Sequence, residues 1–348
     1  MDSVRKPLLR TLAREPLWPP PIWLMRQAGR YLPEYRAVRA KAADFLSLCM
    51  SPDLAAELTL QPIRRYGFDA AILFSDLPII SWALGQRLTY REGEGPILPP
   101  VRDAAALAAL RPEGVATAIT PILDAVRLVR QRLSTEGFEA CTLIGFAGAP
   151  FTVACYMVEG GGSRDFAATR TLAFREPMLF DQLIGLLVEA TVTYLACQIE
   201  AGAEVVMLFD SWAGILPSSQ FHRHVVEPTG NIVKALRQRH PGVPIIGFPR
   251  LAGLRIGEYV AGTLVDGVGL DTSIDLGLLA QTAFPPATWQ GNLDPLALVA
   301  GGEALRMETD QILGAFKGRP CIFNLGHGIV PQTPPEHVAE LVELVRAA

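Results

Sequence analysis

The stretch Val205–Ser211, VVMLFDS, contains a short continuous apolar run that ends in two polar residues. A strand with one face in water would alternate apolar and polar residues, whereas a continuous apolar run suits a parallel strand that is buried on both faces. Eight short apolar runs of this kind occur along the chain. They are Ile22–Met25, Ala70–Phe74, Thr142–Phe146, Val205–Phe209, Pro244–Phe248, Gly267–Leu270, Thr288–Gly291 and Cys321–Leu325.

Segments of helical character lie between the runs, among them Pro52–Tyr66, Val115–Leu133, Pro177–Ala201 and Pro335–Ala347. Eight strands that alternate with helices predict an α/β fold of the (β/α)8 TIM-barrel type. Such barrels take about 250 residues, and the chain has 348. We therefore expect one domain over residues 1–348, with an N-terminal extension, long loops and an insertion between the second and third runs. A doubly wound open sheet is the alternative, although no glycine fingerprint follows the first run.

The composition is that of a globular protein with a local basic cluster. The chain carries 31 basic and 35 acidic residues, a net charge of −4, which argues against a broad nucleic-acid surface. Four arginines nevertheless gather within residues 26–39, so we expect this segment to meet a small anion. The five cysteines form no CxxC pair, and no signal-peptide pattern or long apolar run is evident. These features predict a cytoplasmic protein that does not span a membrane.

Polar residues follow most of the apolar runs. In a TIM barrel the chemistry lies at the carboxyl ends of the strands, so these residues are expected to face one another. The residues in question include Arg26, Gln27 and Arg30 after the first run, Asp76 after the second, Tyr156 beyond the third, Asp210 and Ser211 after the fourth, Arg250 after the fifth, and His327 after the eighth.

Several of these residues also have a purely structural interpretation. An arginine pair four residues apart usually lies on a solvated helix face, but Gly29 and Pro33 interrupt a helix here. Asp76 could cap a turn, and Ser211 could cap the next helix. Tyr156 could belong to the core, and His327, between two glycines, could be structural.

Several kinds of site are absent from the sequence. It has no HExxH, no Cys/His set with the spacing of a structural zinc site and no GxSxG nucleophile elbow. We therefore expect neither a metal nor an organic cofactor.

The segment Met25–Arg36, MRQAGRYLPEYR, resembles the N-terminal signature of the uroporphyrinogen decarboxylases. Further blocks are similar to this family, in order and over nearly the full length. They are Leu60–Asp76 (LQPIRRYGFDAAILFSD), Gly148–Ser163 (GAPFTVACYMVEGGGS), Leu208–Gly214 (LFDSWAG), Gly291–Pro295 (GNLDP) and Phe323–Gly328 (FNLGHG).

The resemblance implies a cofactor-independent barrel enzyme, usually a homodimer, that converts uroporphyrinogen III into coproporphyrinogen III by removing four acetate carboxyl groups. The family's substrate-binding positions fall on Arg26, Gln27, Ala28, Gly29, Arg30, Asp76, Tyr156, Ser211 and His327. Of these, Asp76, Arg26 and Arg30 are the candidate catalytic residues.

Two loops depart from the pattern of the family. Leu77-Pro78 stands where Ile-Leu is common, and Thr272 stands where tryptophan is expected. Two other functions remain open at this level. A barrel methyltransferase that works with a corrinoid protein and zinc would need a His/Cys ligand set at the strand ends. A porphyrinogen-binding homologue without turnover would not need the intact set of polar residues.

The chemistry of the substrate explains the arginines. Uroporphyrinogen carries eight carboxylates, and a guanidinium binds a carboxylate through two parallel hydrogen bonds. Loss of CO2 from a pyrrole acetate needs an electron sink, which the protonated pyrrole ring can supply. Asp76 is then expected to stabilise the cationic ring, while Tyr156, Ser211 and His327 donate to peripheral carboxylates. The general acid stays unassigned.

Overall fold

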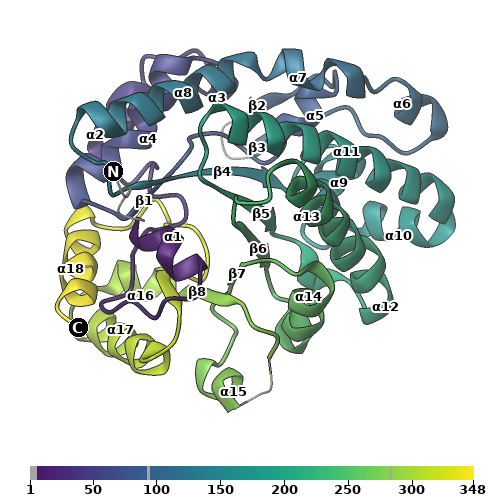
Figure 1. Ribbon diagram of the computed structural model, residues 1–348. Coiled ribbons are helices and arrows are strands. Elements are labelled where there is room, and N and C mark those ends of the chain that lie inside the picture. Colours follow the sequence, from purple (N-terminus) through teal and green to yellow (C-terminus); the bar gives the residue numbers. More distant parts are fainter. Residues whose placement is uncertain (1–5, 92–94, 282–283) are drawn as a thin grey trace.

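The computed structural model describes residues 6–91, 95–281 and 284–348. Its centre is a curled parallel sheet of seven strands in the order β1-β4-β5-β6-β7-β8-β9, with helices on its outer face (Figure 1). The strands are β1 (Ala70–Ile72), β4 (Thr142–Gly148), β5 (Val205–Asp210), β6 (Ile245–Pro249), β7 (Gly267–Gly269), β8 (Thr288–Leu293) and β9 (Cys321–Leu325). Seven of the eight predicted strands are thus confirmed, with boundaries shifted by at most two residues.

The strands are buried on both faces, as their continuous apolar runs predict. Every residue of β4, β6, β7, β8 and β9 is buried. Neighbouring strands run parallel and in register, so that Phe209 of β5 pairs with Phe248 of β6. Their carboxyl ends therefore meet at one edge of the sheet, and the residues that follow the strands lie around a common mouth.

The long helices cover the outer face of the sheet. They are α4 (Pro52–Tyr66), α8 (Thr120–Thr135), α11 (Pro177–Ala201), α13 (Glu227–Arg239), α17 (Gly302–Phe316) and α18 (Pro335–Arg346). Helix α4 begins with Pro52 in its first turn, where a missing N–H costs nothing. It ends at Gly67, whose φ of 64° is left-handed and suits glycine. Its bounds match the sequence prediction.

Smaller elements fill the connections. They are α1 (Pro7–Leu12), α2 (Pro33–Arg39), α3 (Phe45–Cys49), α5 (Ile79–Ala83), α6 (Ala104–Ala108), α7 (Val115–Ala118), α9 (Pro150–Glu159), α10 (Ala167–Arg175), α12 (Ser218–Phe221), α14 (Ile256–Thr263), α15 (Leu276–Gln281) and α16 (Pro295–Ala300). Between β1 and β4 lies the predicted insertion, which includes an antiparallel hairpin of β2 (Thr89–Arg91) and β3 (Gly95–Ile97).

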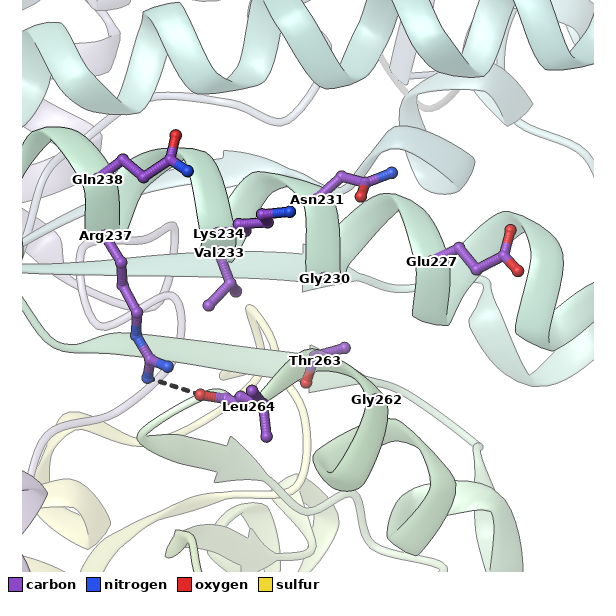
Figure 2. Close-up of a pocket in the computed structure, with 10 residues that line it drawn as sticks. All are labelled: Glu227, Gly230, Asn231, Val233, Lys234, Arg237, Gln238, Gly262, Thr263 and Leu264. Carbon is purple, nitrogen blue, oxygen red and sulfur yellow. Dashed lines mark hydrogen bonds between the residues drawn. The ribbon is translucent and has the colours of Figure 1, made fainter.

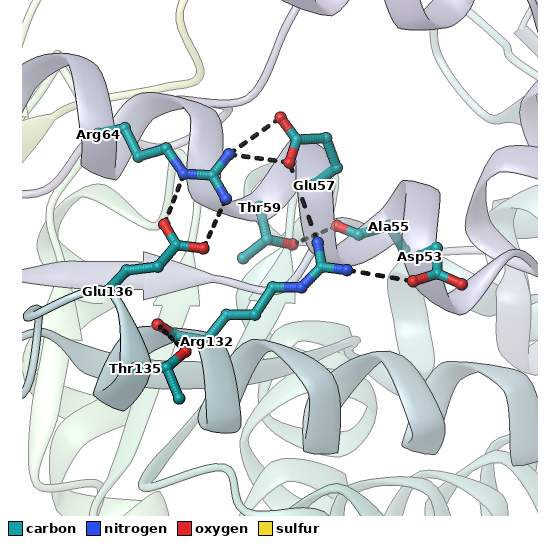
Figure 3. A network of polar contacts seen from close by, with 8 residues as sticks. All are labelled: Asp53, Ala55, Glu57, Thr59, Arg64, Arg132, Thr135 and Glu136. Carbon is teal, nitrogen blue, oxygen red and sulfur yellow. Dashed lines mark hydrogen bonds and ion pairs between the residues drawn. The ribbon is translucent and has the colours of Figure 1, made fainter.

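Helices α4 and α8 are joined by a network of charged side chains (Figure 3). The Arg64 guanidinium donates to Glu57 of its own helix and, at 2.7 Å, to Glu136 directly after α8. Arg132 of α8 donates to Asp53 of α4 over 3.1 Å. These groups are partly exposed, so each pair stabilises the fold by at most about 1 kcal/mol. The apolar faces beneath them contribute more.

The N-terminal extension closes the amino end of the sheet. Leu8 and Leu12 of α1 are buried, and the backbone oxygen of Thr11 accepts a 2.8 Å hydrogen bond from Thr288 at the start of β8. Lys6 donates to the oxygen of Cys141, just before β4, and pairs with Glu204, just before β5. Helix α1 therefore covers the end opposite to the one where the polar residues follow the strands.

The first apolar run lies between β9 and β1 but does not form a full strand. The sequence predicts a strand over Ile22–Met25, whereas the structure has one β-bridge, from Ile22 to Phe323 of β9. On the other side, the Ile22 oxygen accepts from the N–H of Asp69, and the Ile22 N–H donates to the Asp69 carboxylate.

Side chains take over the backbone groups that a full strand would pair. The N–H of Met25 donates to the Asn324 side chain over 2.9 Å. The Gln27 side chain accepts from the N–H of Leu24 and donates to the oxygen of Ala70. The prediction of a strand is wrong here for this reason, although the run occupies the gap between the two edge strands.

Helix α11 is long and apolar enough to cross a membrane by length and composition alone. More than half of its most apolar stretch is buried inside the protein. Gln198 near its end is buried and bonds both backbone groups of Phe146 in β4. These contacts identify α11 as a core helix of the fold.

Replacing Gln27 with leucine is expected to destabilise the protein, because the side chain is 0% exposed and bridges the first run to β1. Leucine leaves the N–H of Leu24 and the oxygen of Ala70 buried without a partner. The expected loss in the free energy of unfolding is about 2–4 kcal/mol, measured by urea denaturation. The control is Gln238→Leu on the exposed side of α13, expected within about 0.5 kcal/mol of wild type. Equal effects of both changes would contradict the bridging role.

Candidate functional site

Asp76 lies four residues after β1, at the mouth of the sheet. One carboxylate oxygen accepts from the N–H of Leu77 over 2.8 Å, and the other accepts from the Tyr90 hydroxyl over 2.7 Å. Burial raises the pKa of Asp76, while these two hydrogen bonds and the charge of Arg26 lower it. Only the oxygen that accepts from Leu77 therefore caps the turn. The other belongs to a side-chain network.

Tyr90 was not foreseen from the sequence. It comes from β2, in the insertion, and its ring packs 5.0 Å from that of Phe45, which itself packs on Phe74. Burial raises the pKa of Tyr90 far above its ordinary value, and the charge of Asp76 raises it further. Tyr90 therefore stays protonated and remains a donor to Asp76. A three-residue polar strand with partly exposed residues offers no signal of this contact in the sequence.

Arg26 and His327 come together from opposite ends of the chain. Arg26 has a left-handed φ of 61° and leaves the first run with an exposed side chain. Its stem lies over Gly328, where any Cβ atom would collide with it. Burial lowers the pKa of His327 to about 4, and the charges of Arg26 and Arg250 act in the same direction. His327 is therefore neutral at neutral pH and can donate a hydrogen bond without carrying charge.

Tyr156 lies on α9, at the side of the mouth. Burial, followed by the charge of Asp76, raises the pKa of Tyr156 to about 12, and the charge of Arg26 opposes this effect. The ring lies edge to face with Trp212, with ring centroids 6.4 Å apart. Tyr156 is thus within electrostatic reach of both Asp76 and Arg26.

A buried acid holds the loop that carries Ser211. Asp210, at the end of β5, is 1% exposed and accepts a 2.6 Å hydrogen bond from the Thr152 hydroxyl. The same hydroxyl accepts from the N–H of Trp212. Burial raises the pKa of Asp210 to about 7. Ser211 itself is partly exposed and does not cap a helix, since the short helix that follows starts at Ala213.

Of the remaining predicted residues, Gln27 is buried, whereas Ala28, Gly29 and Arg30 lie at the surface. Every polar group of Gln27 has a partner inside the protein: its backbone N–H donates to Leu24, its oxygen accepts from Tyr31, and its side chain is bonded as described above. Ala28 and Gly29 are partly exposed, and Arg30 is exposed. The Arg30 backbone oxygen accepts from Arg36, so α2 fixes the turn beneath the arginine.

The two loops that depart from the resembling family are well anchored. Leu77 packs against Gly148, where an added Cβ would lie 3.2 Å from the leucine Cβ. Thr272 is exposed and follows Asp271, whose carboxylate accepts from Ser273 and from the N–H of Leu251. Neither loop displaces a predicted site residue.

Two hollows in the surface lie apart from this cluster. A cavity of about 680 Å³ lies between α13 and the end of α14 (Figure 2). Its Arg237 is already bound to the oxygen of Leu264 and to Asp266. A second cavity, of about 700 Å³, lies between the β2–β3 hairpin and the glycine loop at residues 160–162, one turn beyond Tyr156. The second is lined by Arg91, the neighbour of Tyr90, but no residue of the predicted site lines either cavity.

The cluster combines one acidic group with cationic and neutral donors. Asp76 is its acidic member, Arg26 is the cation whose charge acts on Asp76, and Tyr156 and His327 are neutral side chains that can donate hydrogen bonds. A ligand that is cationic at its centre and anionic at its edge would match this arrangement.

Comparison with known proteins assigns the chain to one group over nearly its whole length. A family model described as "Uroporphyrinogen decarboxylase (URO-D)" matches residues 3–348. A curated protein named uroporphyrinogen decarboxylase from Gluconacetobacter diazotrophicus is 56% identical, with 99% of each chain covered. One of the same name from Granulibacter bethesdensis is 57% identical, again with 99% of each chain covered.

Among solved structures, a methyltransferase from Methanosarcina mazei is similar with a TM-score of 0.76 at 20% identity. The likeness covers 98% of this chain and 97% of the other. A B12-independent methionine synthase from Shewanella is similar with a TM-score of 0.52 at 9% identity, covering 85% and 87% of the two chains. At these identities the likeness concerns the fold alone.

Replacing Tyr90 with phenylalanine is expected to shift the pH dependence of turnover. The lost hydroxyl stabilises the charged form of Asp76, so its removal raises the pKa of Asp76. If the carboxylate is the working form, the acidic limb of the kcat/KM profile moves to higher pH, while the alkaline side changes little. Tyr66→Phe is the control, because its hydroxyl bonds the oxygen of Pro335 and lies beside Tyr31 rather than Asp76. An unshifted acidic limb in Tyr90→Phe would separate Asp76 from the titration that controls activity.

Proposed function

The chain belongs to the uroporphyrinogen decarboxylase family, and from this premise we propose how its strand-end residues bind uroporphyrinogen and remove its carboxyl groups. The enzyme is a carboxy-lyase of tetrapyrrole biosynthesis. In our proposal it takes the four acetate groups from uroporphyrinogen III and releases coproporphyrinogen III. The observation that carries the proposal is the position of Asp76, a partly buried carboxylate among cationic and neutral donors.

The substrate is a ring of four pyrroles with eight carboxylates at its edge. We assign Asp76 to the centre, where its oxygens accept from pyrrole N–H groups. Arg26 and Arg30 lie to one side and bind peripheral carboxylates in the two-pronged geometry that guanidinium favours. Tyr156, Ser211 and His327 donate to further carboxylates. Gln27, Ala28 and Gly29 contribute by shaping the turn between the two arginines.

In each decarboxylation the pyrrole ring itself accepts the electron pair. Protonation of the ring carbon beside the acetate gives a cationic ring, and the bond to the carboxylate then breaks towards it. CO2 leaves, an exocyclic methylene remains, and a proton added there yields a methyl group while the ring loses its own extra proton. The Asp76 charge stabilises the cationic ring before and during bond breaking. No added cofactor is expected, because the substrate supplies the electron sink.

The neutral imidazole of His327 favours a binding role for this residue. With a pKa of about 4, it carries no imidazolium proton at neutral pH. Tyr156 keeps its proton for the converse reason, since its pKa is about 12. Both can hold a carboxylate by donating a neutral hydrogen bond. Arg26 then remains the cation nearest to Asp76 among the residues of the predicted set.

We extend the proposal to the architecture. The segment at residues 21–25 bonds to Phe323 of β9 on one side and to Asp69 before β1 on the other. This supports a complete (β/α)8 barrel in which the segment is the eighth member of the ring. A single domain over residues 1–348 is supported by a core that runs continuously from Leu8 to Val345.

The setting of the enzyme in the cell is also a proposal. All five cysteines are free, and four of them are buried, which suits a reducing cytoplasm. The net charge of −4 favours a small-molecule substrate over nucleic acid, and helix α11 belongs to the core rather than to a membrane. A homodimer is proposed from the resemblance to the family alone.

The direct test is turnover of uroporphyrinogen III by the purified protein, dialysed against a chelator and kept anaerobic so that the substrate stays reduced. We expect products with seven, six, five and finally four carboxyl groups, separated by chromatography after oxidation. A requirement for zinc, pyridoxal phosphate or thiamine would contradict the proposed mechanism, and absence of products from a folded protein would contradict the function.

The matched variant in that assay is Asp76→Asn. Asparagine keeps the size and one acceptor oxygen but removes the charge that stabilises the cationic ring. We expect kcat to fall by about 10²–10³-fold at every step, as for the loss of one preorganised electrostatic partner, with a melting temperature close to wild type. If Asp76 serves only the loop, the variant would instead lose about 1 kcal/mol of stability and keep its turnover.

A further inference from the structure

Arg250 occupies the same mouth as the predicted site residues but is not among them. It directly follows β6, and its N–H donates to the oxygen of Asp210, at the end of β5, over 3.1 Å. Its own oxygen accepts from the N–H of Gly214 over 3.0 Å. The backbone N–H and oxygen of Arg250 are therefore both bonded to the loop that carries Ser211. These bonds fix the backbone from which the Arg250 side chain extends.

The guanidinium of Arg250 has no hydrogen bond or ion pair with any residue in the described part of the chain. Other arginines of the protein are used differently: Arg64, Arg65 and Arg223 each pair with a carboxylate. The acid whose charge acts on Arg250 is Asp271, and its oxygens bind other groups rather than the guanidinium. One accepts from the N–H of Leu251 over 2.6 Å, and the other accepts twice from Ser273.

Arg250 also lies near a group of its own sign, Arg26. Burial lowers the pKa of Arg250, and the charge of Arg26 lowers it further, while Asp271 opposes this effect. The charges of both arginines lower the pKa of His327. Two guanidinium groups and an imidazole thus converge from β6, the first run and β9. A half-buried guanidinium beside a like charge and without a direct partner is unfavourable unless an anion binds there.

We propose that Arg250 is a substrate-binding residue that holds a peripheral carboxylate of the tetrapyrrole, on the β5–β6 side of the mouth. This inference rests on the proposed function. Arg26 and Arg30 come from the single turn after the first run, so they reach one edge of the substrate. Arg250 comes from a strand three places along the sheet from β9, and therefore approaches the mouth from a different side than the arginines of that turn. The ring is then oriented from two sides over Asp76.

The test compares Arg250→Met, Arg250→Lys and the control Arg127→Met. Methionine keeps the apolar stem and removes the charge, whereas lysine keeps the charge and loses the planar fork. Arg127 is an exposed arginine of α8 that pairs with Asp124 of the same helix. Steady-state kinetics with uroporphyrinogen III are measured at several salt concentrations, and melting temperatures report folding.

For Arg250→Met we expect KM to rise about 10–100-fold, the effect of losing one charged hydrogen-bonding partner. The kcat should change little, because the contact exists in both the ground and transition states. The fall of kcat/KM with added salt should become shallower, and Arg250→Lys should lie between methionine and wild type.

Wild-type KM and an unchanged salt dependence in a folded Arg250→Met variant would overturn the assignment of Arg250 while leaving the enzyme function intact. An equal rise of KM in Arg127→Met would overturn the assignment in the same way. Absence of turnover in the wild-type protein would overturn the function and this inference together, so the two failures are distinguishable.

Discussion

The backbone of residues 21–25 is satisfied from both sides, and the site depends on this constraint. Phe323 bonds it from β9, and the Asp69 carboxylate and the Gln27 side chain tie it to β1. A buried peptide group without a partner would cost about 1–3 kcal/mol, so the segment has one position. Where it ends, the left-handed Arg26 turns out of the core. The hydrogen bonds that hold this segment between β9 and β1 therefore also determine where Arg26 leaves the core.

The electrostatics of the mouth follow from this placement. Asp76 stays within reach of Arg26, yet its two oxygens are bonded to Leu77 and Tyr90 rather than to a guanidinium. A direct ion pair would neutralise both charges before the substrate arrived. In the observed arrangement the acid and the arginines keep their charges separate. This suits a substrate with pyrrole N–H groups at its centre and carboxylates at its edge.

The repeating strands of the fold could be predicted from the sequence. Buried parallel strands give continuous apolar runs, so β4, β5, β6 and β9 could be found with nearly correct bounds. Asp76 and His327 could be placed at the carboxyl ends of the strands because each follows such a run closely, and their role in the site stays a prediction. The segment at Ile22–Met25 could not be judged, since side chains replaced the expected backbone pairing there. Such substitution depends on residues as distant as Asn324, which local patterns do not connect.

Tyr90 and Arg250 show a second limit of prediction from the sequence. Tyr90 reaches Asp76 from a short polar hairpin within the insertion, and only the folded chain brings its hydroxyl to the carboxylate. Arg250 does follow an apolar run, but its significance lies in what is missing around it. Whether a guanidinium has a partner is a property of three-dimensional packing. The bridging role of Gln27 was likewise hidden, because the sequence placed it among the substrate-binding positions after the first run rather than in the core.

The central claim is that Asp76 meets the centre of the tetrapyrrole. The most direct measurement is a crystal structure of the protein with coproporphyrinogen, grown and cooled without oxygen so that the ligand stays reduced. The ring should lie across the carboxyl ends of the strands, with pyrrole nitrogens within about 3 Å of the Asp76 oxygens and carboxylates on the arginine side chains. A ring bound in the groove between α13 and α14, or one whose nitrogens make no contact with Asp76, would contradict the claim.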